Sequence, residues 1–167
     1  MTAYESLQAL TLIAFVGLLV WAALQDLLTF TIPNAIPAVL VLLYPFHVLV
    51  AEPHPAWLMS TAIAGVVLAL GMGLFALGLF GGGDAKLLAA LALWAGPSQI
   101  LPTLFVIALA GGVLSVLAWL PQIERLKFAP VRMRPSPGTR FKSRREVPYG
   151  LAIAAGGLVL SVHLIAA

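Results

Sequence analysis

Two aspartates, Asp26 and Asp84, are the side chains of this sequence best placed to do acid–base chemistry. The sequence has six acidic residues, and only these two adjoin segments that are apolar enough to enter a membrane. A charged side chain near hydrocarbon costs a few kcal/mol and indicates a functional site by default. The other four acids are predicted in tails or loops: Glu5, Glu52, Glu124 and Glu146.

Two carboxylates that converge on one water molecule cannot both ionise easily, so one keeps a proton while the other acts as a base. The base activates the water for attack on a peptide carbonyl, and the protonated partner supports the carbonyl oxygen. Such a pair titrates as a unit, so the sequence does not say which aspartate is the base. The pattern therefore predicts hydrolysis by a carboxylate dyad.

Simpler structural roles exist for both residues. Three glycines, Gly81, Gly82 and Gly83, precede Asp84, which is typical of one helix ending and an aspartate capping the next. That role is compatible with catalysis, because the glycines would also give room beside a wet cavity. A surface role for Asp26 is less favoured, since the C-terminal end of a helix dipole is negative.

The composition is that of an integral membrane protein. The chain has 167 residues, 62% of them hydrophobic and only 9% charged, with a mean hydropathy of +1.06; soluble chains are roughly 25% charged. We expect one all-α domain spanning residues 1–167. The absence of cysteine excludes disulfides, zinc–thiolate sites, iron–sulfur clusters and a cysteine nucleophile.

Six apolar segments predict about six transmembrane helices. The first carries no basic residue ahead of it, because the first Lys or Arg is Lys86, so we expect it to remain as a span and not to be a cleaved signal peptide. The fourth segment is short and would fit either a tilted span or a re-entrant helix. The six segments are 7–24, 33–51, 56–80, 85–95, 100–120 and 148–166.

Basic residues predict the topology. Eight of the nine Lys and Arg lie between Arg125 and Arg145, so the loop at about 121–147 is expected in the cytoplasm. This topology explains the basic cluster without nucleic-acid binding. Counting back along the spans places Asp26, Asp84 and Lys86 at the cytoplasmic face and both termini outside. A spanning fourth helix keeps all nine basic residues on one side, which favours it over a re-entrant one.

Three segments stand out together: GGGDAKLLAALALWAGP at 81–97, DLLTFTIPNAI at 26–36 and VPYGLAIAAGG at 147–157. They resemble segments of the prepilin peptidases (type IV leader peptidases) of the GxGD membrane aspartyl protease family. The resemblance implies that Asp26 and Asp84 are the catalytic pair. It also implies a prepilin or pseudopilin substrate, whose basic leader is cut at the cytoplasmic face of the inner (cytoplasmic) membrane during pilus assembly or secretion.

The sequence is similar to the short form of this family associated with tight-adherence (Flp-type) pili. Larger members add a cysteine-containing cytoplasmic segment and an N-methyltransferase activity. Since this chain has no cysteine, we do not expect it to methylate its product. No cofactor is expected, and the oligomeric state is left open.

Several further residues are candidates for shaping the cleft or binding substrate. Gly81, Gly82 and Gly83 would leave space, Lys86 would bias a nearby carboxylate or merely reach the membrane surface, and Asn34 would hydrogen-bond near the site or cap a helix. Tyr149 and Gly150 would line the cleft or simply pack.

Other polar and aromatic side chains are given structural roles. The histidines His47, His54 and His163 are far apart in the sequence and predict no metal site. The tryptophans Trp21, Trp57, Trp94 and Trp119 are predicted as anchors at the membrane interface. Membrane lipids are therefore expected partners of the chain.

Two other classes of function remain open from the sequence. In a proton- or cation-coupled transporter the aspartates would bind the ion, although such sites usually lie near mid-membrane. In a non-catalytic subunit of a pilus or secretion assembly, both aspartates could be replaced by asparagine without effect.

Overall fold

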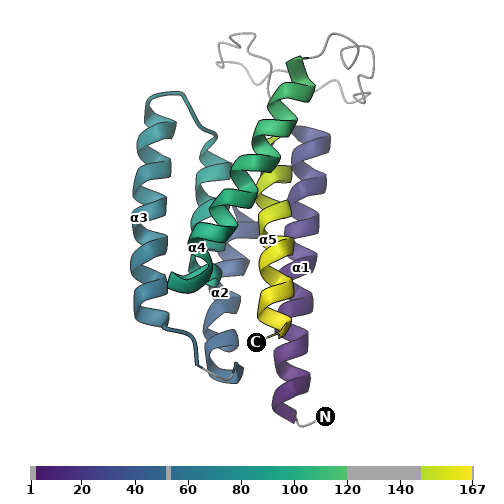
Figure 1. Cartoon of the computed structure of the whole chain (residues 1–167), viewed down its shortest axis with the longest axis vertical. Coiled ribbons are helices and arrows are strands. Elements are labelled where there is room, and N and C mark those ends of the chain that lie inside the picture. Colours follow the sequence, from purple (N-terminus) through teal and green to yellow (C-terminus); the bar gives the residue numbers. More distant parts are fainter. Residues whose placement is uncertain (1–2, 52–53, 120–147, 167) are drawn as a thin grey trace.

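The computed structural model describes residues 3–51, 54–119 and 148–166, which form helices joined by turns (Figure 1). The predicted all-α class is confirmed for this part of the chain. The helices are α1 (Ala3–Thr29), α2 (Ala35–Val50), α3 (Trp57–Ala76), α4 (Gly82–Trp119) and α5 (Tyr149–Ala166).

Helix α4 is two helical arms joined at a sharp break. Gly96 has φ 58° and ψ −173°, a left-handed backbone conformation that glycine adopts without the steric penalty of a side chain. Pro97 follows it and suits the first turn of a new helix. We call residues 82–95 the first arm and residues 97–119 the second arm. Figure 1 shows the second arm turning back along the bundle.

The first arm of α4 forms the centre of the bundle. Of the residues from Leu87 to Ala95, only Leu88 is not fully buried, so this part of the arm is apolar on all sides, as an enclosed helix must be. It packs against α1, α2 and α5. The buried core contributed by these elements includes Leu12, Phe15 and Leu19 of α1, Ile36 and Leu40 of α2, Leu87 and Leu91 of the first arm, and Ile153 and Leu160 of α5.

Trp94 belongs to this core, which corrects its predicted role as an interface anchor. It is 3% exposed, stacks on Phe15 with ring centroids 4.4 Å apart, and donates a hydrogen bond from Nε1 to the Leu40 carbonyl oxygen at 3.0 Å. The indole N–H therefore has the partner that a buried tryptophan needs. Trp21 and Trp57 are exposed, as an anchor would be.

Helix α3 lies at the side of the bundle, where it packs on α4 and exposes most of its surface (Figure 1). Its only buried residues are Ser60 and Gly71. A Cβ on Gly71 would lie 2.9 Å from the Ala85 Cβ and 3.3 Å from the Ala85 Cα. The small residue thus allows the two helices to approach closely, as small residues do in membrane bundles.

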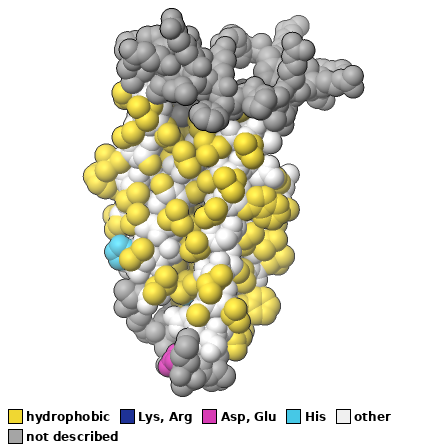
Figure 2. All heavy atoms as spheres, turned by 90° about the vertical axis from the view of Figure 1, so that its right-hand side faces the viewer, with side chains coloured by type: hydrophobic (Ala, Val, Ile, Leu, Met, Phe, Trp, Pro, Cys, Tyr) yellow, Lys and Arg dark blue, Asp and Glu magenta, His cyan; other side chains and the backbone are white. Residues whose placement is uncertain are grey.

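The outer surface is hydrophobic over most of its described length. Figure 2 shows one such face, on which hydrophobic side chains predominate, and many large apolar side chains, such as Leu42 and Leu101, are exposed. Among the described residues, three stretches are long and apolar enough to cross a membrane: Glu5–Thr29, Trp57–Ala76 and Gly82–Leu117, the last of which is divided into two arms at Gly96. The chain is a helical membrane protein.

The expected count of six spans remains a prediction. Helices α2 and α5 are apolar but shorter than a typical span, and the fourth and fifth predicted segments are the two arms of α4. Several helix boundaries differ from expectation, two of them next to the site. Helix α1 continues past Leu24 to Thr29 and so includes Asp26, and α3 ends at Ala76, before a turn in which Gly78 has φ 70°.

Different helix ends and side chains lie at the two ends of the bundle. The start of α1 and the end of α5 lie at one end, and the aspartates lie at the other, together with Trp119 and Tyr149 (Figure 1). The basic segment at about 121–147 is outside the described residues, as is Glu52. That both termini face the outside of the cell remains a prediction.

The close approach of α3 to α4 makes Gly71 a test of the fold. Gly71→Ala should destabilise the protein by about 1–3 kcal/mol, because the new methyl group meets the Ala85 backbone. For a chain of this size that corresponds to a Tm decrease of roughly 2–10 °C, measured by thermal unfolding in detergent.

Gly73→Ala is the matched control, since a Cβ there meets nothing within 4 Å. It should leave Tm unchanged or raise it slightly, because alanine favours a helix over glycine. Equal effects of the two substitutions would contradict the packing described here.

Candidate active site

Asp26 lies in the last turn of α1 and is held by the start of α5. The side chain is 5% exposed. Its Oδ2 accepts a hydrogen bond from the Gly150 backbone N–H at 2.7 Å, and the backbone N–H of Leu151 also bonds to this carboxylate. Backbone amides at the first turn of a helix have no partner within the helix and readily bind a carboxylate. The N-terminus of α5 therefore fixes the orientation of Asp26.

Gly150 makes this contact possible because it has no side chain. A Cβ at this position would lie 2.8 Å from the Asp26 Oδ2 and 2.9 Å from both its Cβ and Cγ. From the sequence, Gly150 was expected either to line the cleft or simply to pack against neighbouring residues. The structure shows that it packs directly on a candidate catalytic carboxylate.

Asp84 lies in the first turn of α4 and is half-buried. Its predicted role as the N-cap is wrong, because the helix begins at Gly82, and the Gly81 carbonyl oxygen accepts the first helical hydrogen bond, from Ala85 at 3.0 Å. An acid in the first turn is still stabilised by the positive end of the helix dipole. The carboxylate bends back over Gly81, where any Cβ would overlap its Oδ2.

Each of the three glycines before Asp84 makes a different close approach. Gly81 faces the Asp84 carboxylate, Gly82 lies against the Phe75 ring of α3, and Gly83 lies against Ile32. A Cβ on Gly83 would be 3.3 Å from the Ile32 carbonyl oxygen. The glycines thus bring the start of α4 close to α3 and to the segment that links α1 to α2.

The two aspartates lie near enough to interact electrostatically, although 58 positions separate them in the sequence. One comes from the end of α1 and the other from the start of α4. Their carboxylates repel each other when both are ionised. The structure therefore brings together the pair that the sequence singled out.

Asn34 and Lys86 join the same two segments at the surface of the site. Lys86 Nζ donates a hydrogen bond to Asn34 Oδ1 at 2.9 Å, and both side chains are exposed. Asn34 occupies the N-cap position of α2, but its side chain makes no capping hydrogen bond and bonds to Lys86 instead. The hydrogen bond links the start of α2 to the first turn of α4, next to Asp84.

Aromatic side chains flank the same end of the bundle. The rings of Phe80 and Tyr149 have centroids 6.3 Å apart, and the Tyr149 hydroxyl lies 3.4 Å from the Ser115 hydroxyl of the second arm. Sequence reasoning did not single out Phe80, Ile32 or Ser115. Only the position of Phe80 directly before the three glycines could have indicated its place near the site.

No group of three His, Cys, Asp or Glu side chains in the described ranges is arranged to hold a metal ion. The chemistry that the observed arrangement can support is acid–base chemistry by two carboxylates. One of them is oriented by backbone amides, and the other lies at a helix N-terminus.

Comparison with known proteins identifies the family. Residues 13–116 match the family model described as the type IV leader peptidase family, and this region contains both Asp26 and Asp84. No curated protein and no solved structure matches the chain. Since the match covers more than half of the sequence, and the region it covers brings two carboxylates together at one end of the bundle, the chain belongs to the type IV leader peptidase family.

Proposed function

We propose that this protein is a membrane aspartyl endopeptidase that removes the basic leader peptide from prepilins or pseudopilins. Membership of a peptidase family supports the reaction class. The observation that carries the proposal is the interaction between Asp26 and Asp84, two carboxylates from distant parts of the chain. Among the acids of the described residues, only these two lie at this end of the bundle.

In the proposed reaction one aspartate acts as a general base and the other as a general acid. The ionised aspartate takes a proton from a water molecule as its oxygen attacks the scissile carbonyl carbon, and the protonated aspartate donates a hydrogen bond to the carbonyl oxygen. The tetrahedral intermediate then collapses as a proton passes to the amide nitrogen and the C–N bond breaks. The roles belong to the pair, so neither residue is assigned as the base.

The surrounding contacts support this proposal by limiting the motion of both carboxylates. The Gly150 amide binds one oxygen of Asp26, and Gly81 lies directly against Asp84. A fixed arrangement favours catalysis because reacting groups held in place need no further ordering. We propose that the Asn34–Lys86 hydrogen bond shapes the exposed surface beside Asp84, where a substrate would approach.

The proposed site of cleavage is the cytoplasmic face of the inner membrane. The strongly basic segment at about 121–147 begins after Trp119 and ends before Tyr149, both at the aspartate end of the bundle. Basic loops stay in the cytoplasm, and so does a basic leader peptide. Enzyme site and scissile bond would then meet on the same side, within a pilus-assembly or secretion pathway.

Replacing either aspartate tests the dyad. Asp26→Asn and Asp84→Asn should each reduce leader removal by roughly 10²–10⁴-fold or more, because an amide neither accepts nor donates the catalytic proton. The measurement is mass spectrometry of the N-terminus of a co-expressed prepilin. The same spectrum should show a product without N-methylation.

Thr61→Val is a suitable control, since Thr61 is exposed on α3 and bonds only within its own helix, to the Trp57 carbonyl oxygen. All three variants should reach the membrane in equal amounts. Full cleavage by either asparagine variant would rule out the dyad. Ion flux in vesicles, in a protein that cleaves nothing, would instead favour a transporter.

Gly150→Ala tests the positioning of Asp26 without changing its chemistry. The methyl group must push the carboxylate away or shift the start of α5. A displacement of about 1 Å can cost about 10²-fold in rate, so we expect a large decrease in the rate of cleavage. Gly112→Ala is the matched control on α4, because a Cβ there meets nothing within 4 Å. Equal cleavage by the two alanine variants would contradict the proposed role of Gly150.

A further inference from the structure

Tyr149 is the first residue of α5, and its ring contacts two other segments at the aspartate end of the bundle. It pairs with the Phe80 ring of the turn between α3 and α4, with centroids 6.3 Å apart and planes inclined at 56°, a separation at which aromatic rings attract each other. A Cβ on Gly111 of the second arm would lie 3.4 Å from the Tyr149 Cε1 and 3.6 Å from its Cδ1. The ring therefore packs against the bare backbone at Gly111.

These contacts connect the two segments that hold the aspartates. Gly150 follows Tyr149 directly, and its N–H donates the 2.7 Å hydrogen bond to the Asp26 Oδ2. Phe80 directly precedes Gly81, over which the Asp84 carboxylate bends. The Tyr149 ring thus links the backbone that binds one carboxylate to the backbone beside the other.

The start of α5 depends on contacts outside the helix to stay in place. The first N–H groups of a helix have no partner within it, and helix ends fray. At Gly150 the partner is Asp26, at 2.7 Å, and a shift of about 1 Å would take this pair beyond hydrogen-bonding distance. Packing of the neighbouring ring on other segments opposes such a shift.

The ring and the hydroxyl of Tyr149 contribute unequally. The hydroxyl lies 3.4 Å from the Ser115 hydroxyl, whereas O–H···O hydrogen bonds are usually about 2.5–3.0 Å long. The hydroxyl contact is therefore weak, and the packing of the ring on Phe80 and Gly111 is the contact that can hold the helix end.

We propose that Tyr149 is a positioning residue, whose ring fixes the start of α5 so that the Gly150 N–H keeps Asp26 oriented beside Asp84. Its effect on cleavage rests on the proposed peptidase function, but its effect on the start of α5 does not. Because the ring acts through Gly150 and not on the substrate, its loss should lower kcat and leave KM unchanged.

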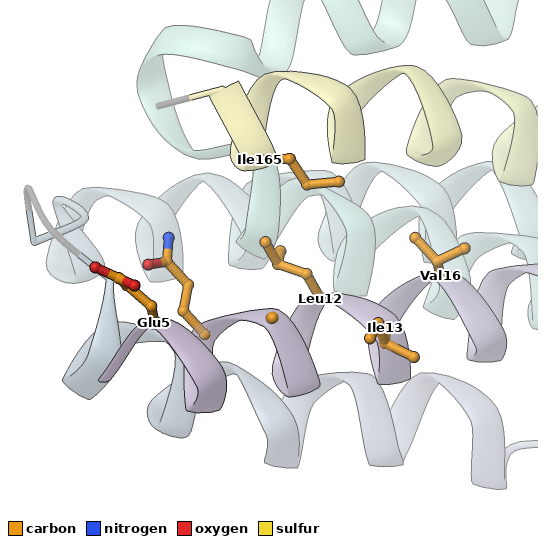
Figure 3. A pocket seen from close by; sticks show the side chains of 7 residues that line it. Glu5, Leu12, Ile13, Val16 and Ile165 are labelled. Carbon is orange, nitrogen blue, oxygen red and sulfur yellow. The ribbon is translucent and has the colours of Figure 1, made fainter. Parts of the chain in front are cut away.

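The opposite end of the bundle supplies a control position. A cavity of about 400 Å³, lined in part by the three histidines, lies there beside the break at Gly96. Figure 3 shows an apolar groove along α1, which is lined by Leu12, Ile13 and Val16 among others. Ile13 lies thirteen residues before Asp26 in the same helix, about 20 Å away at 1.5 Å per residue. Ile13→Ala should therefore cleave like wild type.

Cleavage kinetics of the full-length protein in detergent test the proposal. The substrate is a synthetic peptide with a basic leader, one glycine and an apolar segment. Tyr149→Ala should lower kcat about 10²-fold, since a displacement of about 1 Å can cost that much, with KM unchanged. Tyr149→Phe keeps the ring and should restore kcat to within about twofold of wild type, because only the weak hydroxyl contact is lost.

Two adjacent glycines of the second arm give a matched pair that leaves Tyr149 in place. Gly111→Val puts a side chain into the space of the ring, whereas a Cβ on Gly112 meets nothing within 4 Å. Gly111→Val should lower kcat about tenfold or more, and Gly112→Val should not. Adding Gly111→Val to Tyr149→Ala should lower kcat little further, because both changes remove the same contact.

Hydrogen–deuterium exchange of the Gly150 and Leu151 amides, followed by mass spectrometry, measures the positioning without cleavage. Loss of the contact opens the start of α5 locally, so exchange should be about tenfold faster in Tyr149→Ala and unchanged in Tyr149→Phe. If the wild type cleaves no peptide, the proposed function fails, and this exchange still decides whether the ring holds the helix end.

Three results would overturn the role of Tyr149 while leaving the peptidase intact. The first is wild-type kcat in Tyr149→Ala. The second is an equal loss in Tyr149→Phe, which would assign the effect to the hydroxyl. The third is a raised KM at unchanged kcat, which would make the ring a substrate contact. If Tyr149→Ala does not fold, the comparison of Gly111→Val with Gly112→Val decides in its place.

Discussion

The electrostatic interaction between Asp26 and Asp84 is the constraint around which this end of the bundle is built. Two carboxylates in an apolar protein repel each other and lose hydration, so the fold must hold them by other contacts. It does so with the amides that open α5, with the first turn of α4 and with glycines that allow backbone to approach each carboxylate. Gly81 and Gly150 thus play the same role, Gly81 beside Asp84 and Gly150 beside Asp26.

The buried first arm of α4 positions Asp84 next to Asp26. It begins at the aspartate end beside Ile32 and runs through the core to Gly96 at the other end, where the chain reverses. The first arm therefore connects the candidate active site to the cavity at the opposite end of the bundle. The reversal also returns the second arm to the aspartate end, where it contacts the start of α5.

Much of this arrangement could be predicted from the sequence, because apolar segments and a clustered set of basic residues limit the possible topologies. The sequence was sufficient to predict the helical class, the positions of the apolar segments and the choice of the two aspartates. Local signals misled where tertiary contacts decided the outcome. Trp94 is a residue type that often anchors a helix at the membrane interface, but it lies in the core and bonds to Leu40. Asn34 is a residue type that often caps a helix with its side chain, but that side chain bonds to Lys86. The grouping of three distant histidines around one cavity depends on how five helix ends meet, which no local pattern encodes.

The proximity of the two aspartate side chains can be tested directly by cysteine cross-linking, because the chain has no cysteine of its own. In an Asp26→Cys/Asp84→Cys double variant in native membranes, a short bifunctional thiol reagent should bridge the two cysteines within one chain. Mass spectrometry would show one reagent added and both thiols lost. The single-cysteine variants should each react only at one end of the reagent. If both cysteines react separately with a small monofunctional reagent but are never bridged, the two side chains do not share a site, and the account of the dyad is contradicted.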